Sequence, residues 1–448
     1  MITKPKWTVL VYMVADTGDR FYQDAMADIA EMTKAEFDER VRVLVHADAP
    51  APWQTKCWEV AGVRHLAGGG SATVKMGVAK EVPCHDKNLL DFVQNVVDNY
   101  ESDYYLLVLW GHGEGIDWKE KVLAGRASSP TIQGKRFAPG SQDGIDVGAL
   151  GKSLAELRLQ RVNRENVVVG FDACLMGMVE VFDEIEPYVG WVVAAADEIP
   201  DTGWPYTDVL QVLGKYPDTQ PKDLAKAIVD VCARWYSKYN YITGEELESG
   251  DSSGAKVSFA ACGLSDSSVR DSMGALTTAL RAGIRDISAW NAVKEARDFA
   301  EDLSEKAYVD LYAFCSGLAR LTEYPELRDA ANNVIDALDD SIAAFQFSSS
   351  YPQKYLEDAR AVSICFPESD ELLGSIANLQ VNWRSYIDLT FNHMTHWYLF
   401  LTEFWKQAAG QRRSTQAQSS GKSSSILIEY VHIPVKGGMP GERTRTKK

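Results

Sequence analysis

Residues 166–186 constrain the fold more strongly than any other part of the chain. Residues 167–171 form a run of apolar and mostly β-branched side chains, which is too short for an ordinary helix and is typical of a buried strand in a parallel sheet. Asp172 and Cys174 follow directly, and apolar residues then recur at helical spacing as far as Ile185. We therefore expect a strand that passes into an amphipathic helix, with Cys174 at the junction.

The position of Cys174 favours a chemical role. In open α/β sheets, ligands bind outside the carboxyl ends of the strands, and the N-terminus of a helix favours negative charge. A thiol at such a place is expected to have a pKa below its usual value of about 8.5, because the helix and nearby cations stabilise the thiolate. The alternative is that Cys174 is a small core residue, as free cysteines often are.

A second segment strengthens the chemical interpretation. Residues 105–110 form another buried apolar run, which ends in the glycine-rich sequence from Gly111 to Gly115. His112 lies in that turn, so two strands side by side would bring an imidazole and a thiol to the same edge of the sheet. This arrangement activates a cysteine nucleophile. The glycines on both sides of His112 leave room for the backbone of a substrate.

An ordered set of motifs resembles the clostripain-like family of caspase-type cysteine peptidases, in the clan that also contains gingipains, legumain and separase. The set covers most of the chain: WTVLVYMVAD, LVLWGHGEG, GFDACLMGMVEV, DEIPDTGWPY, YVDLYAFC and AVSICFP. The resemblance implies an α/β, caspase-like fold, with a mostly parallel central sheet flanked by helices and an α/β C-terminal domain or extension. It also implies a cysteine endopeptidase that cleaves after Arg or Lys, with Cys174 as nucleophile and His112 as base and acid.

Acyl transfer also needs groups that bind the oxyanion and the substrate. Two aimed donors are required for the oxyanion, and the backbone N–H groups of Gly113 and Cys174 are the candidates, although Gly113 could serve the turn alone. Side chains alternate along an extended segment, so Asp172 points to the same side as Cys174. Asp172 matches the Asp that the family has two residues before its nucleophile, and we expect its carboxylate to bind Arg or Lys in the first substrate pocket.

The DEIPDTGWPY segment holds further candidates for substrate binding. Glu198 and Asp201 could add negative charge to the pocket, and Trp204 or Tyr206 could form a wall. A structural role accounts for each of these four residues equally well.

Two positions next to His112 depart from the family pattern. Many relatives have Asp where this chain has Gly111, and Gly is common in place of Glu114. The alternative function is therefore a catalytically silent protein that keeps the fold and binds basic peptides, and the intact His112 and Cys174 argue against it. A redox role for Cys174 is weak, because no resolving cysteine lies nearby in the sequence.

A long polar stretch follows His112. Residues 123–144 are rich in Gly, Pro and Ser, and such a loop inside a compact domain is usually functional or disordered. Relatives are commonly matured by cleavage after a basic residue in this region, so the resemblance implies self-processing at Arg126, Lys135 or Arg136. Alternatively, this is an exposed loop that proteases cut without consequence.

Composition narrows the partners and the compartment. A formal net charge of -17 argues against nucleic-acid binding and suits cationic substrates, although negative charge is also ordinary in soluble proteins. The seven cysteines are widely spaced without a CxxC pair, which predicts no disulfide framework and a reducing compartment. No apolar run is long enough to span a membrane. We expect a monomer that is cytoplasmic, or secreted if a leader has been removed.

Calcium is the one cofactor that the resemblance suggests. The reaction requires no cofactor, but some family members bind Ca²⁺. The acidic residues Asp16, Asp19, Asp48 and Asp117 lack EF-hand spacing, so the sequence neither places nor excludes a calcium site.

The domain organisation follows from the distribution of motifs. We predict a catalytic domain over residues 1–215, a C-terminal α/β domain over 216–409, and a linker, a possible strand and a basic tail over 410–448. The second part contains no motif of chemistry. It is expected to hold strands at 256–264 and 361–366, and among its helices one at 326–345; residues 411–425 read as a linker and 426–435 as a last strand.

Overall fold

The computed structural model describes residues 4–50, 52–68, 71–82, 89–113, 115, 136–137, 145–147, 150–151, 154, 162–248, 254–264, 267–300, 303, 307–351, 357–368 and 386–420. Side chains of 65–68, 71–75, 136–137, 145–146 and 411–420 are outside this description. The chain divides into two compact units, Met1–Trp405 and Lys406–Lys448. The sheet and the candidate site belong to the first.

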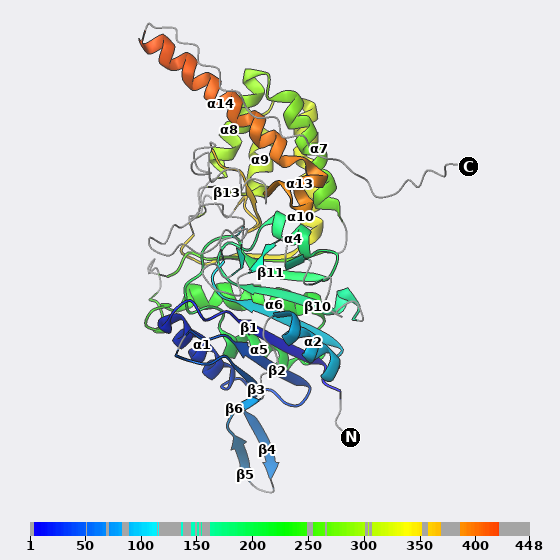
Figure 1. Ribbon diagram of the computed structural model, residues 1–448, viewed down its shortest axis with the longest axis vertical. Coiled ribbons are helices and arrows are strands. Elements are labelled where there is room, and N and C mark those ends of the chain that lie inside the picture. Colours follow the sequence, from blue (N-terminus) through cyan, green and yellow to red (C-terminus); the bar gives the residue numbers. More distant parts are fainter. Residues whose placement is uncertain are drawn as a thin grey trace, which may run out of the picture. The chain divides into compact units, whose positions relative to one another are not determined.

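A nine-stranded, mostly parallel sheet forms the centre of the first unit (Figure 1). Five central strands run parallel, in the order β11-β10-β7-β1-β2, and antiparallel pairs extend the sheet at both edges, β12 and β14 next to β11 and β3 and β6 next to β2. The strands are β1 (Trp7–Met13), β2 (Val41–Ala47), β3 (Lys56–Ala61), β6 (Val78–Val82), β7 (Tyr104–Trp110), β10 (Val167–Asp172), β11 (Trp191–Ala195), β12 (Ser258–Gly263) and β14 (Ile342–Phe347). The predicted α/β class with a mostly parallel central sheet is confirmed.

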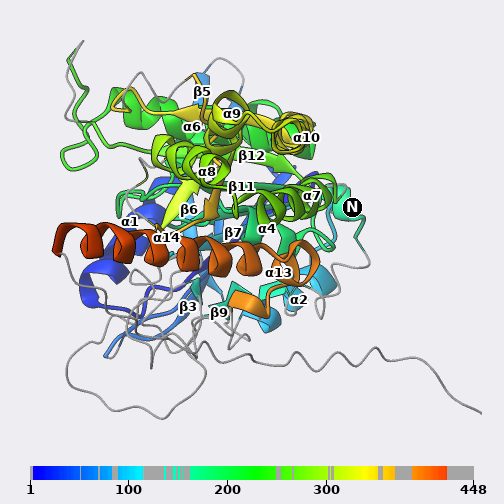
Figure 2. The same cartoon turned by 90° about the horizontal axis from the view of Figure 1, so that it is seen from above.

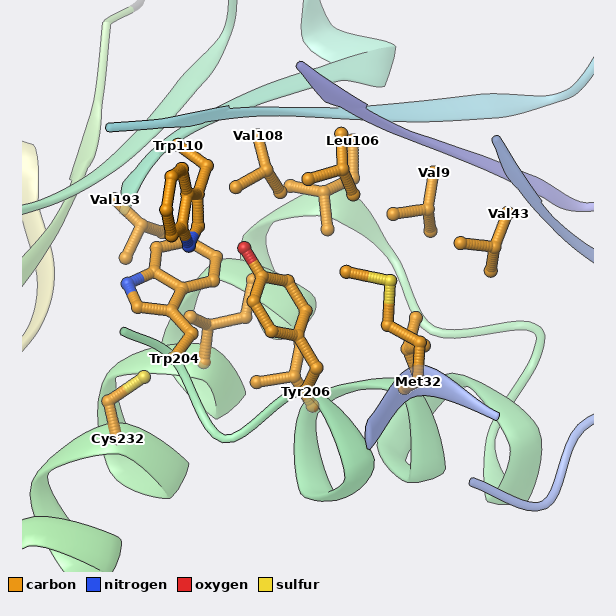
Figure 3. Close-up of a cluster of buried hydrophobic side chains, with 14 of the residues drawn as sticks. Val9, Met32, Val43, Leu106, Val108, Trp110, Val193, Trp204, Tyr206 and Cys232 are labelled. Carbon is orange, nitrogen blue, oxygen red and sulfur yellow. The ribbon is translucent and has the colours of Figure 1, made fainter. Parts of the chain in front are cut away.

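The central strands are mostly apolar because helices cover both faces of the sheet. Val9 and Val11 point to one face, where α1 (Asp19–Met32), α5 (Tyr206–Lys215) and α6 (Pro221–Lys238) close a large hydrophobic core. Figure 3 shows part of this core, with Trp110, Trp204 and Tyr206 packed between the sheet and the helices. Tyr12 points to the other face, toward Phe92 of α2 (Leu89–Asn99).

Helices from the second half of the chain pack on one another beside the sheet (Figures 1 and 2). They are α7 (Ser268–Gly283), α8 (Ile287–Phe299), α9 (Leu311–Leu321), α10 (Pro325–Ser341) and α13 (Thr390–Thr395). A small sheet of β13 (Tyr308–Asp310) and β15 (Ser363–Cys365) lies with them, and Ser363 forms a bridge with Met178, just after the Cys174 segment. The predicted boundary near residue 215 falls at the end of α5, and residues beyond it supply two strands of the same sheet.

The remaining short strands form two hairpins. β4 (Arg64–Gly68) pairs with β5 (Ser71–Lys75), and β8 (Arg136–Phe137) pairs with β9 (Ile145–Asp146).

Three predicted elements differ from the structure. The helix expected directly after Cys174 begins only at α4 (Val179–Ile185). The helix predicted at 326–345 ends at Ser341, because the alternating sequence IAAFQF continues as β14 and pairs with β12. The predicted linker from residue 411 is helical as far as Ser420, in α14 (Trp397–Ser420), since Gln, Arg and Ala are good helix formers. The strand predicted at 426–435 lies outside the described residues.

One cysteine contradicts the prediction from cysteine spacing. Cys57 on β3 is disulfide-bonded, whereas Cys174, Cys232, Cys262, Cys315 and Cys365 are free thiols. Wide spacing in the sequence failed here because it does not report which residues the folded chain brings together. A disulfide is typical of oxidising compartments, so the cysteines no longer favour a reducing one. Within the described part of the chain, no helix is long and apolar enough to cross a membrane.

Candidate active site

His112 and Cys174 lie just beyond two adjacent parallel strands. β7 pairs with β10 so that Trp110 is opposite Asp172, and the N–H of Gly111 donates to the Asp172 carbonyl at 3.2 Å. His112 and Cys174 are each two residues beyond this pair, at the same edge of the sheet. A Cβ at Gly113 would lie 2.0 Å from the Cys174 carbonyl oxygen, so the two turns approach more closely than any side chain at Gly113 would permit.

The backbone after Cys174 turns sharply before the helix begins. Leu175 has a left-handed φ of 61°, which is rare for a residue other than glycine. Its N–H donates to the Asp197 carbonyl at 3.1 Å, and the N–H of Gly177 donates to the Ala195 carbonyl at 2.7 Å. The segment is thus held against the loop that follows β11, and Cys174 is not at a helix N-terminus.

The thiol of Cys174 is correspondingly not activated in the empty site. Burial raises its pKa to about 11; the carboxylates of Glu198, Asp201 and Asp172 act in the same direction, against the Ile199 N–H, which lowers it. The expectation of a lowered thiol pKa is therefore wrong for this conformation. The helix N-terminus that was expected to stabilise the thiolate lies at Val179, five residues after Cys174.

Ile199 holds the sulfur from the backbone. Its N–H donates to Cys174 Sγ at 3.3 Å, and its carbonyl oxygen lies 3.4 Å from Sγ, in position to accept the thiol proton. The loop after β11 therefore covers the thiol.

The ring of His112 is positioned by an aromatic stack. Phe21 of α1 lies parallel to the imidazole, with ring centroids 4.0 Å apart and an interplanar angle of 7°. The same Phe21 contacts Trp110 at 4.5 Å between centroids. Because α1 contributes Phe21 and β7 contributes Trp110, the orientation of the imidazole depends on both elements.

Asp172 is 3% exposed and is bonded on only one of its two oxygens. Oδ2 accepts from the backbone N–H of Trp204 at 3.0 Å and from the hydroxyl of Tyr206 at 2.8 Å. Oδ1 is buried and has no hydrogen-bond partner among the residues that the structure describes. Burial raises the pKa of this carboxyl group to about 7, opposed by its two hydrogen bonds and assisted by Glu31.

Gly203 packs directly against this carboxyl group. A Cβ there would lie 2.7 Å from Oδ2 and 3.1 Å from Oδ1 of Asp172, and its φ of 58° also favours glycine. The hydroxyl of Tyr236 donates to the Gly203 carbonyl at 2.6 Å and fixes the turn. Any side chain at this position would clash with the carboxyl group of Asp172.

The other predicted pocket residues divide into two groups. Trp204 and Tyr206 have buried side chains in the core (Figure 3), so their contact with Asp172 is a hydrogen bond from each and not an exposed wall. Glu198 and Asp201 are exposed and act on the Cys174 thiol through their charge. Asp201 also lies 3.8 Å from Arg20 at the start of α1, between Oδ2 and Nη2.

Sequence reasoning missed the contribution of α1. Besides Phe21, this helix supplies Asp28, which accepts from Trp110 Nε1 at 2.7 Å, and Glu31, which accepts from the Tyr206 N–H at 2.9 Å. A signal was present, because Asp28 falls on the buried stripe of Tyr22, Ala25, Ile29 and Met32. A carboxyl group on an apolar helix face needs an explanation.

Several predicted residues fall at or beyond the limits of the description. Arg136 lies in β8, whereas Arg126, Lys135 and Glu114 lie outside the described residues. No group of three His, Cys, Asp or Glu side chains that could hold a metal ion occurs in the ranges described.

A thiol and an imidazole at the ends of adjacent strands of a mostly parallel sheet are typical of a cysteine-type peptidase. Residues 11–405 match the sequence model of the clostripain family. The chain therefore belongs to this family of cysteine peptidases.

Solved structures of similar fold come from the same family. A secreted C11 cysteine protease from Bacteroides thetaiotaomicron, in complex with an irreversible peptide inhibitor, is 18% identical with a TM-score of 0.57 and covers 88% of this chain and 99% of its own. An inactive zymogen C11 protease from Parabacteroides distasonis is 15% identical with a TM-score of 0.56, at the same coverages of 88% and 99%. No curated protein sequence matches the chain.

Proposed function

We propose that this cysteine peptidase is an endopeptidase that cleaves after Arg or Lys, with Cys174 and His112 as its catalytic dyad. The observation that carries the specificity is the free, buried Oδ1 of Asp172, two residues before the nucleophile. A buried carboxylate with an unused acceptor is best satisfied by a charged donor, and Arg or Lys supplies one.

The reaction follows from the positions of the two side chains. His112 takes the Cys174 proton as Sγ attacks the scissile carbonyl carbon, and a C–S bond forms while the carbonyl π electrons move to oxygen. The backbone N–H groups of Gly113 and Cys174 are the proposed donors to that oxyanion. The imidazolium then protonates the leaving amine as the C–N bond breaks, and water releases the acyl group by the reverse sequence.

Substrate must also release the thiol from its resting contacts. In the empty site, Sγ is held by Ile199 and surrounded by carboxylates that raise its pKa. A cationic side chain that binds at the site offsets the negative charge of Glu198 and Asp201, so binding of the preferred substrate favours the thiolate.

The test is hydrolysis of fluorogenic peptides that differ only in the residue before the cleaved bond: Arg, Lys, Asp or Leu. Cys174→Ala should abolish turnover, whereas Cys262→Ala, at a buried thiol on β12, should retain it. Asp172→Asn keeps the hydrogen-bond acceptor and removes the charge. It should lower kcat/KM for Arg and Lys about 100-fold, equal to roughly 3 kcal/mol, and leave Leu unchanged.

We also propose that the protein cleaves itself and that its activity depends on Ca²⁺, and the same protein samples test both proposals. Intact Cys174→Ala protein beside a cleaved wild type on a denaturing gel would support processing, and the fragment masses would distinguish Arg126, Lys135 and Arg136. Chelation with EDTA would report any requirement for Ca²⁺. If no peptide is cut, even after trypsin treatment and with Ca²⁺ added, the endopeptidase proposal is wrong and a silent protein that binds basic peptides replaces it.

A further inference from the structure

Asp172 belongs to a group of three carboxyl groups that are linked through the core. Glu31 of α1 accepts from the backbone N–H of Tyr206, whose hydroxyl donates to Asp172. Asp28, one turn earlier on α1, accepts from Trp110, the residue opposite Asp172 in the sheet. Two elements far apart in the sequence thus bring acidic groups to the back of the proposed pocket.

The described side chains around Asp172 provide no positive charge to balance an ionised carboxylate. Its neighbours Tyr206, Tyr236 and Cys232 are buried, which raises the pKa of each well above its usual value and keeps each neutral. Burial and the Asp172 charge likewise raise the pKa of Asp28 well above its usual value. Glu31 is the charged group that acts on Asp172, and it is also an acid.

Geometry alone points to a protonated Asp172 in the empty site. An ionised carboxylate in the core needs a cation or several donors, and here Oδ2 has two donors while Oδ1 has none. A proton on Oδ1 removes the charge at the oxygen that lacks a partner. A pKa of about 7 agrees with this view.

We propose that a basic side chain enters this pocket in exchange for a proton, and that Glu31 helps to set the pH at which the exchange occurs. The inference rests on the proposed function, because it concerns the same pocket. In the exchange, the Oδ1–H bond breaks, the proton leaves to solvent, and the ammonium or guanidinium group of the substrate pairs with the carboxylate. The pocket is therefore neutral both before and after the exchange, and the released proton carries the positive charge to solvent.

Two consequences follow for recognition. Below pH 7, affinity for a basic ligand should rise about tenfold per pH unit, because one proton must be displaced, and it should level off above pH 7. A neutral ligand displaces no proton, so its affinity should not follow this curve. Discrimination between basic and neutral residues would therefore weaken as the medium becomes acidic.

Calorimetry with the Cys174→Ala full-length protein tests the exchange without turnover. N-acetyl-arginine amide would be titrated between pH 5.5 and 8.5 in pairs of buffers with different ionisation enthalpies, and N-acetyl-norleucine amide serves as the uncharged ligand. We expect release approaching one proton per arginine ligand at pH 6 and little release at pH 8.5. Adding Asp172→Asn should abolish the arginine-specific release.

Glu31→Gln keeps an oxygen acceptor for the Tyr206 N–H and removes the charge. It should move the midpoint of the affinity curve to lower pH, whereas Glu295→Gln, the same change at an exposed position of α8, should not. Affinity for the arginine ligand that is flat with pH, or proton release that persists in Asp172→Asn, would overturn the inference.

The two proposals fail separately. Proton-coupled binding to Cys174→Ala without any peptide hydrolysis by the wild type would refute the peptidase and leave the exchange standing. Hydrolysis after Arg together with pH-independent binding would support the peptidase and refute the exchange.

Discussion

At the scale of single residues, the Asp172 carboxyl group illustrates a conflict between function and stability. Burial raises its pKa from 3.8 to about 7 in the folded protein. Between these two values, the folded protein keeps a proton that the unfolded chain has released, so the stability of the wild type falls as the pH rises and levels off above pH 7. The residue that we propose for substrate recognition therefore destabilises the empty protein at neutral and alkaline pH.

Asp172→Asn should reverse this cost. The amide oxygen can accept the same hydrogen bonds from Trp204 and Tyr206, but it carries no charge. The stability advantage of this variant over the wild type should grow by about 2–3 kcal/mol as the pH rises from 5 to 8. Urea unfolding at each pH measures the change. Asp329→Asn on the exposed face of α10 should follow the wild-type curve, and parallel curves for both variants would contradict the shifted pKa.

Residue-level prediction from sequence succeeded for placement and failed for chemistry at Cys174. Two buried apolar runs, each followed by a reactive side chain, were enough to bring His112 and Cys174 to one edge of a parallel sheet. The activated thiol was wrong because Leu175 adopts a left-handed φ and delays the helix to Val179. A leucine gives no sequence signal for this conformation, whereas a glycine would have.

At the scale of elements, the loop between β11 and α5 connects Cys174 to the second half of the chain. The hydroxyl of Tyr351, just after β14, donates to the buried carboxylate of Asp197, which also caps the N–H of Glu198. The Asp197 carbonyl accepts from Leu175, and Ile199 holds the thiol. Tyr351 is therefore a positioning residue that acts on Cys174 through this loop.

Tyr351→Phe should loosen the loop without removing a group that touches substrate. Loss of a hydrogen bond to a buried carboxylate should lower the free energy of unfolding by about 1–3 kcal/mol. Cys174 should also react faster with iodoacetamide, because Ile199 covers it less firmly. Tyr312→Phe is the matched control, since that hydroxyl makes a long 3.4 Å bond to Asp339 near the surface. Equal stability and equal alkylation rates in both variants would show that Tyr351 does not support the loop.

Element-level prediction worked best where burial gives a continuous pattern. β7 and β10 were recognisable because both of their faces are covered, so their sequences form continuous apolar runs. β14 was missed because it follows α10 without a Gly or Pro to mark the change. The Cys57 disulfide was missed for a related reason: spacing along the chain does not report which cysteines meet in the fold.

At the scale of the whole molecule, residues after the catalytic motifs complete the same sheet. β12 pairs antiparallel with β11, and β14 pairs with β12. Helix α6 covers the core face with Leu224, Ile228 and Val229. The predicted boundary near residue 215 therefore cuts through a hydrophobic core, whereas the compact unit and the family match both end at residue 405.

Truncation should separate these two limits. A fragment of residues 1–215 removes β12, so β11 becomes an unpaired edge strand, and it removes α6 from the core face. We therefore expect aggregation and binding of a hydrophobic dye. A fragment of residues 1–420 keeps both, along with the hydrogen bond from Trp405 Nε1 to the Pro367 carbonyl at 2.9 Å. It should unfold cooperatively in urea with the midpoint of the full chain. A soluble, cooperatively folded 1–215 fragment would instead show that the catalytic motifs form an independent domain, and that the second half is an addition to it.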